Sequence, residues 1–351
     1  MKSLYLIGTP GSGKTAIALG LALKFRKEGL NAGYFKPVGS TPGVAAAHDE
    51  DGILMKEVLK LDESLDTLVP LTASLFYVSA FKDPKYCQEK VLNAYQAIAA
   101  KYDPVIIDGS SFPWVMAGFG LDAPSIARLT QSAVLCTIKV DNDFTFDEAV
   151  FINNYASMMG VPMVGTVFNN VPRPLLAKTE GPYASLLASF GYRWMGTIPR
   201  RREIHAPTVA EFFEVLGGEI LTGEDRLDLL VEDVLIGAMT IESAIDNLRR
   251  SLNKAVITGG DRADYALAAL ETSTSVLILT GGLYPNVNVV ARASEKGVPV
   301  ILVHYDTYTT IEKLSAVTRR IRPGDDRAIG MALENIERYC NWHEILESLK
   351  V

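Results

Sequence analysis

Gly8-Thr9-Pro10-Gly11-Ser12-Gly13-Lys14-Thr15 fits the pattern G-x-x-x-x-G-K-[ST] of a phosphate-binding loop. Residues 3–7 before it form a short apolar run typical of a strand, and residues 16–25 after it repeat apolar positions at helical spacing. Backbone N–H groups and the helix dipole bind polyphosphates in this strand–loop–helix context. The alternative is a glycine-rich turn that binds nothing, and it accounts poorly for the whole pattern in this setting. The stretch therefore predicts a nucleotide site.

Two side chains of this loop carry specific chemistry. Lys14 is placed to reach the terminal phosphates, and the Thr15 hydroxyl is placed to ligate Mg²⁺. The predicted nucleotide-binding residues of the loop are Gly8, Thr9, Pro10, Gly11, Ser12, Gly13, Lys14 and Thr15.

Composition narrows the class of protein. A chain of 351 residues is long enough for about two domains. Its net charge of −7, without any basic run, argues against a nucleic-acid surface. The three cysteines and four histidines lack the spacing of a disulfide framework or a metal site, which fits a reducing compartment. No apolar stretch reaches eighteen residues. We expect a cytoplasmic protein that binds neither nucleic acid nor membrane.

The first 200 residues alternate between strand-like and helix-like segments. Continuous apolar strands between helices predict a parallel sheet covered on both faces, the α/β class of the P-loop NTPases. The expected strands are 3–7, 32–38, 104–108, 133–140, 161–168 and 192–199, and the expected helices include 16–25, 49–61 and 84–102.

A charged break at 200–203, between Pro199 and Pro207, marks the expected domain boundary. A second, smaller α/β pattern follows it, with strands expected at 254–258, 275–280 and 298–303. We predict domains at 1–203 and 204–322, followed by a helical tail at 323–351.

Several chemically notable residues fall at predicted strand ends, where parallel sheets bind ligands. Lys36 is suited to neutralising charge during phosphoryl transfer, but its spacing alone favours a solvated lysine before a turn proline. Asp108 resembles the second acidic residue of phosphate-loop enzymes. Asn169 fits an adenine-reading amide or a turn asparagine equally well. Residues 49–51 supply either a helix cap or a carboxylate for Mg²⁺.

These features together resemble the dethiobiotin synthetase–like family of ATPases. The resemblance is closer still to the dethiobiotin synthetase–like N-terminal region of long bacterial phosphotransacetylases, and it covers residues 1 to about 199. The stretches that carry it, in chain order, are the glycine loop, Lys36-Pro37-Val38, Asp51, Ile107-Asp108-Gly109, Phe168-Asn169 and Gly196-Thr197-Ile198-Pro199.

The resemblance implies roles for individual residues. Lys14, Lys36 and Ser40 match the family's catalytic side chains. Thr15, Asp51 and Asp108 match its Mg²⁺ ligands, and Asn169 matches its adenine-side residue. One departure is that residues 108–113 replace the glutamate and Gly-Ala-Gly-Gly loop of dethiobiotin synthetase. Another is that the phosphate loop of dethiobiotin synthetase is one residue longer and carries an acidic residue that this chain lacks. We therefore do not expect dethiobiotin synthesis.

The second domain looks like the DRTGG domain, over about residues 206–321. Its name pattern is matched by Asp261-Arg262 and by Thr280-Gly281-Gly282, each following a predicted strand. We expect these residues either to form a small-ligand site or subunit contact, or to be ordinary turn residues, which their types alone favour slightly. The resemblance implies a role in regulation or assembly.

The expected function is an ATP- and Mg²⁺-binding regulatory or sensory protein. One alternative is an ATP-hydrolysing, carboxylate-activating ligase or synthetase acting on a small acid. Another is an assembly module that the nucleotide stabilises. Only about thirty residues follow Ile321, so we expect the acetyltransferase domain of long phosphotransacetylases to be absent. The resemblance also favours a homo-oligomer, and the expected ligands are a nucleotide and a small effector or acid.

Overall fold

The computed structural model describes residues 2–39, 49–74, 76–81, 83–201, 204, 206–237, 239–315, 317 and 320–350. Ser40 lies outside the described residues. The chain divides into two compact units, unit 1 with Met1–Arg201 and Ile321–Val351, and unit 2 with Arg202–Arg320. Within the described residues, no helix is both long and apolar enough to cross a membrane.

Unit 1 is built on a parallel sheet of six strands, in the order β2-β5-β1-β6-β7-β8. Strands β1, β2 and β5 are buried at every position, as a sheet covered on both faces requires. This confirms the predicted fold class. The strands are β1 Leu4–Gly8, β2 Gly33–Phe35, β5 Val105–Asp108, β6 Ala133–Lys139, β7 Met163–Val171 and β8 Trp194–Pro199.

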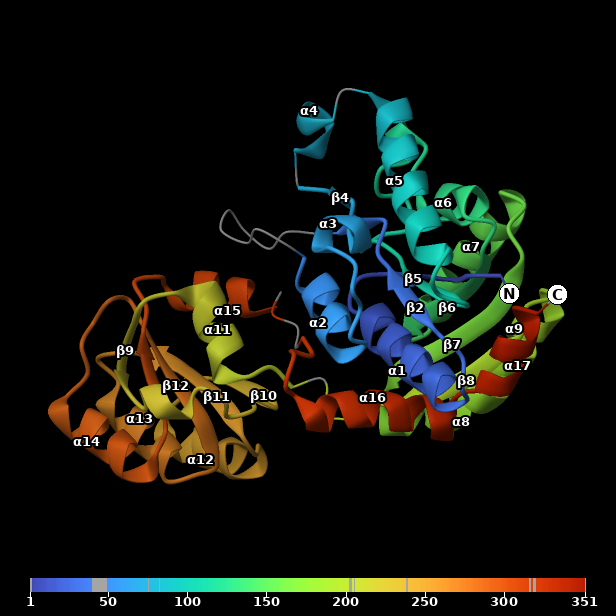
Figure 1. Cartoon of the computed structure of the whole chain (residues 1–351). Coiled ribbons are helices and arrows are strands. Elements are labelled where there is room, and N and C mark those ends of the chain that lie inside the picture. Colours follow the sequence, from blue (N-terminus) through green and yellow to red (C-terminus); the bar gives the residue numbers. More distant parts are fainter. Residues whose placement is uncertain are drawn as a thin grey trace. The chain divides into compact units, whose positions relative to one another are not determined.

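Helices link these strands and lie on both sides of the sheet (Figure 1). The helix after the phosphate loop is α1, Lys14–Lys27, which begins inside the loop itself. Its N-terminus therefore lies at the carboxyl end of β1, where a phosphate group meets the positive end of the helix dipole. The other helices of this part are α2 Glu50–Val58, α3 Leu65–Leu68, α4 Tyr77–Ala80, α5 Pro84–Ala99, α6 Ala123–Leu129, α7 Phe144–Met158, α8 Leu176–Lys178 and α9 Ala184–Ser189.

The stretch 32–38, expected to be one strand, is divided. Strand β2 ends at Phe35, and β3, Val38–Gly39, pairs with β4, Leu71–Thr72, in a separate two-stranded sheet. Pro37 has no N–H to donate to a ladder, so the chain leaves the main sheet there. Lys36 consequently lies between two sheets, just beyond the carboxyl end of β2.

The C-terminal segment, expected to be one helix, forms α16 (Asp326–Tyr339) and α17 (Trp342–Ser348) and belongs to unit 1. Helix α16 packs closely on α1, since a Cβ on Gly20 would lie 2.4 Å from the Ala332 carbonyl oxygen. The backbone N–H of Asn341 donates to the Met195 carbonyl of β8 at 2.8 Å. The tail therefore completes the fold of the nucleotide-binding unit.

Unit 2 contains a five-stranded sheet in the order β10-β11-β12-β13-β9, with β9 antiparallel to β13. The sequence predicts the three central strands but not β9 and β10, which are short and largely accessible to solvent. The strands are β9 Glu219–Thr222, β10 Asp233–Ile236, β11 Lys254–Gly259, β12 Thr274–Thr280 and β13 Val300–Leu302. The helices are α11 Val209–Leu216, α12 Ile241–Arg250, α13 Ala263–Leu270, α14 Val287–Lys296 and α15 Thr307–Ser315.

Candidate nucleotide site

The phosphate loop is held in shape by its glycines and by neighbouring strands. A Cβ on Gly8 would lie 2.1 Å from the Thr137 carbonyl oxygen of β6, so only glycine fits there. Gly13 has a φ of +80°, and a Cβ on it would lie 2.1 Å from the Asn169 side-chain amide. Ser12 is buried, and its hydroxyl is 3.2 Å from that of Thr137. The loop is therefore shaped before any ligand binds.

Lys14 points back into this loop. Its ammonium donates to the carbonyl oxygens of Gly8 (3.2 Å), Thr9 (3.0 Å) and Ser111 (3.5 Å). Burial lowers its pKa to about 8, despite the opposing charge of Asp108. A cation held only by neutral carbonyl oxygens beside a helix N-terminus is well prepared to bind an anion.

Two hydroxyl groups donate hydrogen bonds to the same carboxylate oxygen of Asp108, the last residue of β5. The Thr15 hydroxyl donates to Asp108 Oδ2 at 2.8 Å, and the Tyr34 hydroxyl donates to the same atom at 3.1 Å. Asp108 Oδ1 is buried and has no hydrogen-bond partner among the described residues. Burial raises the pKa of Asp108 to about 6, although the positive charge of Lys36 opposes the shift. The site thus contains an unsatisfied carboxylate oxygen.

Lys36 is buried between two carboxylates of the α2 N-terminus. Its ammonium is 3.0 Å from Asp49 Oδ1 and also contacts the carboxylate of Asp51. Burial acts to lower its pKa, but the charges of Asp51, Asp108 and Asp49 outweigh burial and raise it. Lys36 therefore stays charged, and it lies among the same acids that the sequence assigns to Mg²⁺.

The donor set fits Mg²⁺. Thr15, Asp51 and Asp108 supply only oxygen atoms, and Oδ1 of Asp108 is an orphaned buried acceptor that a cation or its water would satisfy. Among the described residues, no group of three or more His, Cys, Asp or Glu side chains suits a metal ion by itself. Mg²⁺ commonly binds through one or two carboxylates together with substrate phosphates and water, so this sparse set suits it.

Asn169 lies inside β7 and contacts the phosphate loop. Its side-chain amide donates to the Ser12 carbonyl oxygen at 2.9 Å, and the residue is buried. Next to it, Asn170 has a φ of +52°, and its side chain accepts from Arg200 Nε at 3.0 Å. Arg200 also pairs with Asp141 at 3.1 Å. Reading of adenine by Asn169 stays a prediction.

Sequence reasoning missed two residues of this site. Tyr34 reads as an ordinary apolar strand position, yet its hydroxyl reaches Asp108. Asp49 is one of three acids at a helix start, and sequence offers no reason to prefer it. In the structure it caps α2, accepting from the backbone N–H groups of Asp51 and Gly52, while it pairs with Lys36. Only the pairing of strands β2 and β5 reveals the first contact.

The predicted residues of unit 2 lie at the carboxyl ends of β11 and β12, which are neighbours. Arg262 donates to the carbonyl oxygens of Gly237 (3.4 Å) and Met239 (3.0 Å). The Thr280 hydroxyl is 3.0 Å from that of Thr307. Gly281 and Gly282 have positive φ angles, and their N–H groups donate to the carbonyl oxygens of Tyr305 (2.8 Å) and Val303 (2.9 Å), both just after β13. Asp261 is exposed. The role of these residues in binding stays a prediction.

Two family models match the chain. The one described as an AAA domain matches residues 2–208, more than half of the chain, and the chain belongs to this family. The DRTGG domain model matches residues 211–317. The expected combination of a dethiobiotin synthetase–like phosphate-loop domain with a DRTGG domain is therefore confirmed.

Curated relatives agree with this assignment. Phosphate acetyltransferase of Nitratidesulfovibrio vulgaris is 23% identical and aligns with 98% of this chain and 51% of its own length. That of Synechocystis is 25% identical over 99% of this chain and 52% of its own length. ATP-dependent dethiobiotin synthetase BioD of Akkermansia muciniphila is 29% identical over 49% of this chain and 79% of its own length. The chain spans about half the length of the phosphate acetyltransferases it matches.

Solved structures to which the chain is similar include the septum site-determining protein MinD of Pyrococcus horikoshii complexed with Mg-ADP. It is 14% identical, covers 58% of this chain and 84% of its own, and has a TM-score of 0.40. The CBS and DRTGG domains of Clostridium perfringens pyrophosphatase, complexed with diadenosine tetraphosphate, are 22% identical. They cover 33% of this chain and 51% of their own, with a TM-score of 0.29.

Proposed function

We propose that this member of the AAA-domain family binds ATP with Mg²⁺ at the phosphate loop and uses it as a regulatory or sensory nucleotide. The support is the preformed loop together with Lys14 and Thr15, which contact neutral carbonyl oxygens and Asp108 respectively. The proposal that Mg²⁺ binds here rests on Asp108 Oδ1, a buried acceptor that has no hydrogen-bond partner among the described residues. The likeness to phosphate acetyltransferases supports a regulatory role, performed here by both units together as a cytoplasmic homo-oligomer.

Calorimetry on the whole chain tests this function. ATP should bind in the presence of Mg²⁺ and bind more weakly in EDTA, because Thr15 and Asp108 would hold the metal beside the phosphates. Asp108→Asn should remove most of that difference while keeping metal-free binding. Equal ATP affinity with and without Mg²⁺ in the wild type would refute the magnesium role. The regulatory role predicts that a partner is retained in an ATP-dependent manner while phosphate release stays slow.

A second candidate is an ATP-dependent carboxylate-activating ligase, and Lys36 is the observation that favours it. The Lys36 ammonium is buried, and the charges of three carboxylates raise its pKa. Keeping such a charge out of water costs free energy, and this one lies among the candidate Mg²⁺ ligands. Such a charge accelerates phosphoryl transfer if it stabilises the transition state more than bound ATP.

Lys36 also separates the two candidates. In a ligase, Lys36→Met should leave ATP affinity within a few-fold and lower phosphate release by about 10²-fold, a typical cost of losing one preorganised charge. In a regulator there is little turnover to lose, and the change affects ATP affinity or partner release. Stopped-flow ATP binding beside a phosphate-release assay distinguishes them. Measurable hydrolysis that ignores the substitution would remove Lys36 from the mechanism.

A further inference from the structure

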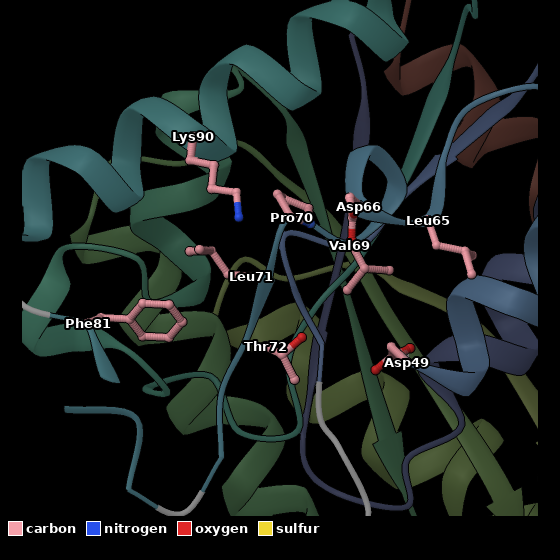
Figure 2. Close-up of a pocket in the computed structure, with 9 residues that line it drawn as sticks. All are labelled: Asp49, Leu65, Asp66, Val69, Pro70, Leu71, Thr72, Phe81 and Lys90. Atoms are coloured by element: carbon pink, nitrogen blue, oxygen red, sulfur yellow. The ribbon is translucent and has the colours of Figure 1, made fainter. Parts of the chain in front are cut away.

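A cavity of about 270 Å³ lies in unit 1 beside the phosphate site, between α3, β4 and α5 (Figure 2). Its walls include the apolar side chains of Leu65, Val69, Leu71 and Phe81. This volume lies just below the range of roughly 300–1,000 Å³ that is typical of pockets for drug-sized ligands. A molecule of about the size of an amino acid suits it.

Besides Asp49, which is paired with Lys36, two charged side chains of opposite sign line the same cavity. Lys90 projects from α5 and Asp66 from α3, and Figure 2 shows them on either side of Pro70. Within the described part of the chain, neither side chain forms an ion pair or a hydrogen bond. An apolar wall with one ammonium and one carboxylate is complementary to a zwitterion that has an apolar side chain.

Asp49 joins this cavity to the nucleotide site. Its side chain lines the cavity and is almost fully buried. The same carboxylate accepts a hydrogen bond from Lys36 at 3.0 Å and caps α2. The cavity therefore borders the same carboxylate that holds Lys36.

We propose that this cavity is a second ligand site, for a small zwitterionic amino acid with an apolar side chain. Lys90 binds the ligand's carboxylate, Asp66 binds its ammonium group, and the side chain lies along Val69, Leu71 and Phe81. Through Asp49 and Lys36, the bound amino acid weakens ATP binding, and ATP weakens amino-acid binding by the same factor. The coupling rests on the proposed ATP function, whereas the amino-acid site does not.

Three unbranched probes with the same number of carbon atoms test the ligand class. Calorimetry on the full chain without nucleotide should show binding of norleucine, and at least about tenfold weaker binding of hexanoate and hexylamine, each of which leaves one charged wall unpaired. Hexanoate or hexylamine binding as tightly as norleucine would overturn the zwitterion assignment. Absence of norleucine binding would overturn the site.

Exposed residues provide variants that should fold normally. Lys90→Met and Asp66→Asn should each weaken norleucine binding by about tenfold, the effect of one charge-assisted contact. Lys85→Met is the matched control, because Lys85 lies on the same helix, is strongly exposed and does not line the cavity. If Lys90→Met binds norleucine as the control does, the cavity is not the site.

The coupling has its own readout. Saturating norleucine should weaken ATP binding by at least about fivefold, the lower end of typical coupling between sites. Lys36→Met should bind norleucine but show no such effect, since the link through Asp49 is cut. Failure of the wild type to bind ATP would refute the proposed function while leaving norleucine binding measurable. Norleucine binding with unchanged ATP affinity would refute the coupling.

Discussion

Units 1 and 2 both place polar residues at the carboxyl ends of parallel strands, but these residues make different kinds of contact. In unit 1, Lys14, Lys36 and Asp108 are each at most 8% exposed and lie in one electrostatic cluster. In unit 2, Arg262 is bonded to two backbone carbonyls and Thr280 to a neighbouring hydroxyl. The polar residues of unit 1 form a cluster of buried charges, whereas those of unit 2 form hydrogen bonds within the turns that follow the strands.

This difference shows that position at a strand end does not by itself identify a chemical site. Burying an ionised group costs several kcal/mol unless partners compensate for it, so a fold that keeps three of them in one place has a strong reason for doing so. Arg262 and Thr280 of unit 2 instead satisfy their polar groups through hydrogen bonds to nearby backbone carbonyls and to a neighbouring hydroxyl. We therefore expect perturbations at the two edges to differ in kind.

The largest contrast is expected between Lys14→Ala and Arg262→Ala. Lys14→Ala should weaken ATP binding by about 100-fold, corresponding to ~2.7 kcal/mol, because the phosphates lose a charge-assisted donor. Arg262→Ala should leave ATP affinity unchanged and lower the thermal stability of unit 2, because the loop after β10 loses two hydrogen bonds. Calorimetry and thermal unfolding of both variants check this. A comparable loss of ATP affinity in Arg262→Ala would erase the distinction between the edges.

The second contrast is in the pH dependence of ATP affinity, which we expect to come from residues of unit 1 alone. ATP and Mg²⁺ favour protonated Lys14 and ionised Asp108, whose pKa values are about 8 and about 6. Affinity should therefore be highest between these values and fall by nearly tenfold per pH unit beyond either of them. Asp108→Asn should flatten the acid limb alone. Calorimetry from acid to alkaline pH, in buffers of equal ionic strength, measures the profile.

The raised pKa of Asp108 also has a consequence for stability. Below about pH 4 the carboxyl group is protonated in both the folded and the unfolded chain. Between that pH and about 6 the native state holds the proton more tightly, so stability should fall as the pH rises through this window. Asp108→Asn should remove this contribution in urea unfolding at low ionic strength. A stability that rises through the window because of Asp108 would contradict the shift.

Much of unit 1 could be predicted because its signals are local. A few adjacent residues are enough to predict the phosphate loop, the helix after it and the acidic residue that ends β5. The fold class follows from the alternation of apolar strand-like runs with helix-like segments. Proline chemistry at Pro37 divides a stretch that otherwise reads as one strand. The division of the C-terminal helix near Cys340, and its packing on α1, depend on contacts between residues far apart in the chain.

The missed parts of the site have the same physical origin. Tyr34 has no polar neighbour in sequence, and it reaches Asp108 only because β2 pairs with β5. Lys36 contacts both Asp49 and Asp51 because α2 begins directly after Asp49, which brings both carboxylates to the helix N-terminus. In unit 2, β9 and β10 are short edge strands, and their apolar stretches at 220–221 and 234–236 are too brief to stand out as strands in the sequence.

Asn169 gives a smaller and sharper test of unit 1. If it reads adenine, the wild type should prefer ATP to GTP, and Asn169→Ala should weaken ATP binding by about tenfold and GTP binding by less. Its hydrogen bond to Ser12 predicts a shared loss of about fivefold for both nucleotides, near 1 kcal/mol for one bond. Paired titrations therefore separate the two contributions. An equal loss for both nucleotides would limit Asn169 to holding the phosphate loop.

The smallest expected effect concerns Tyr34, and its matched control is Tyr5. Both are fully buried tyrosines on the two strands that flank β5, but the Tyr5 hydroxyl has no hydrogen-bond partner among the described residues. Tyr34→Phe removes one of the two hydroxyl donors to Asp108 Oδ2. The carboxylate loses stabilisation of its charged form, so its pKa should rise further and Mg²⁺-dependent ATP binding should weaken by about fivefold on the acid side of about pH 6.

The pH profile distinguishes positioning from packing. Because the loss acts through the proton on Asp108, Tyr34→Phe should move the acid limb of ATP binding to higher pH and have less effect near pH 8. Tyr5→Phe should leave both the limb and the affinity unchanged, since no hydrogen bond to the site is removed. A uniform loss at every pH in Tyr34→Phe, matched by Tyr5→Phe, would mean that Tyr34 only fills the core. A shift confined to Tyr34→Phe would identify its hydroxyl as the group that tunes the Mg²⁺ carboxylate.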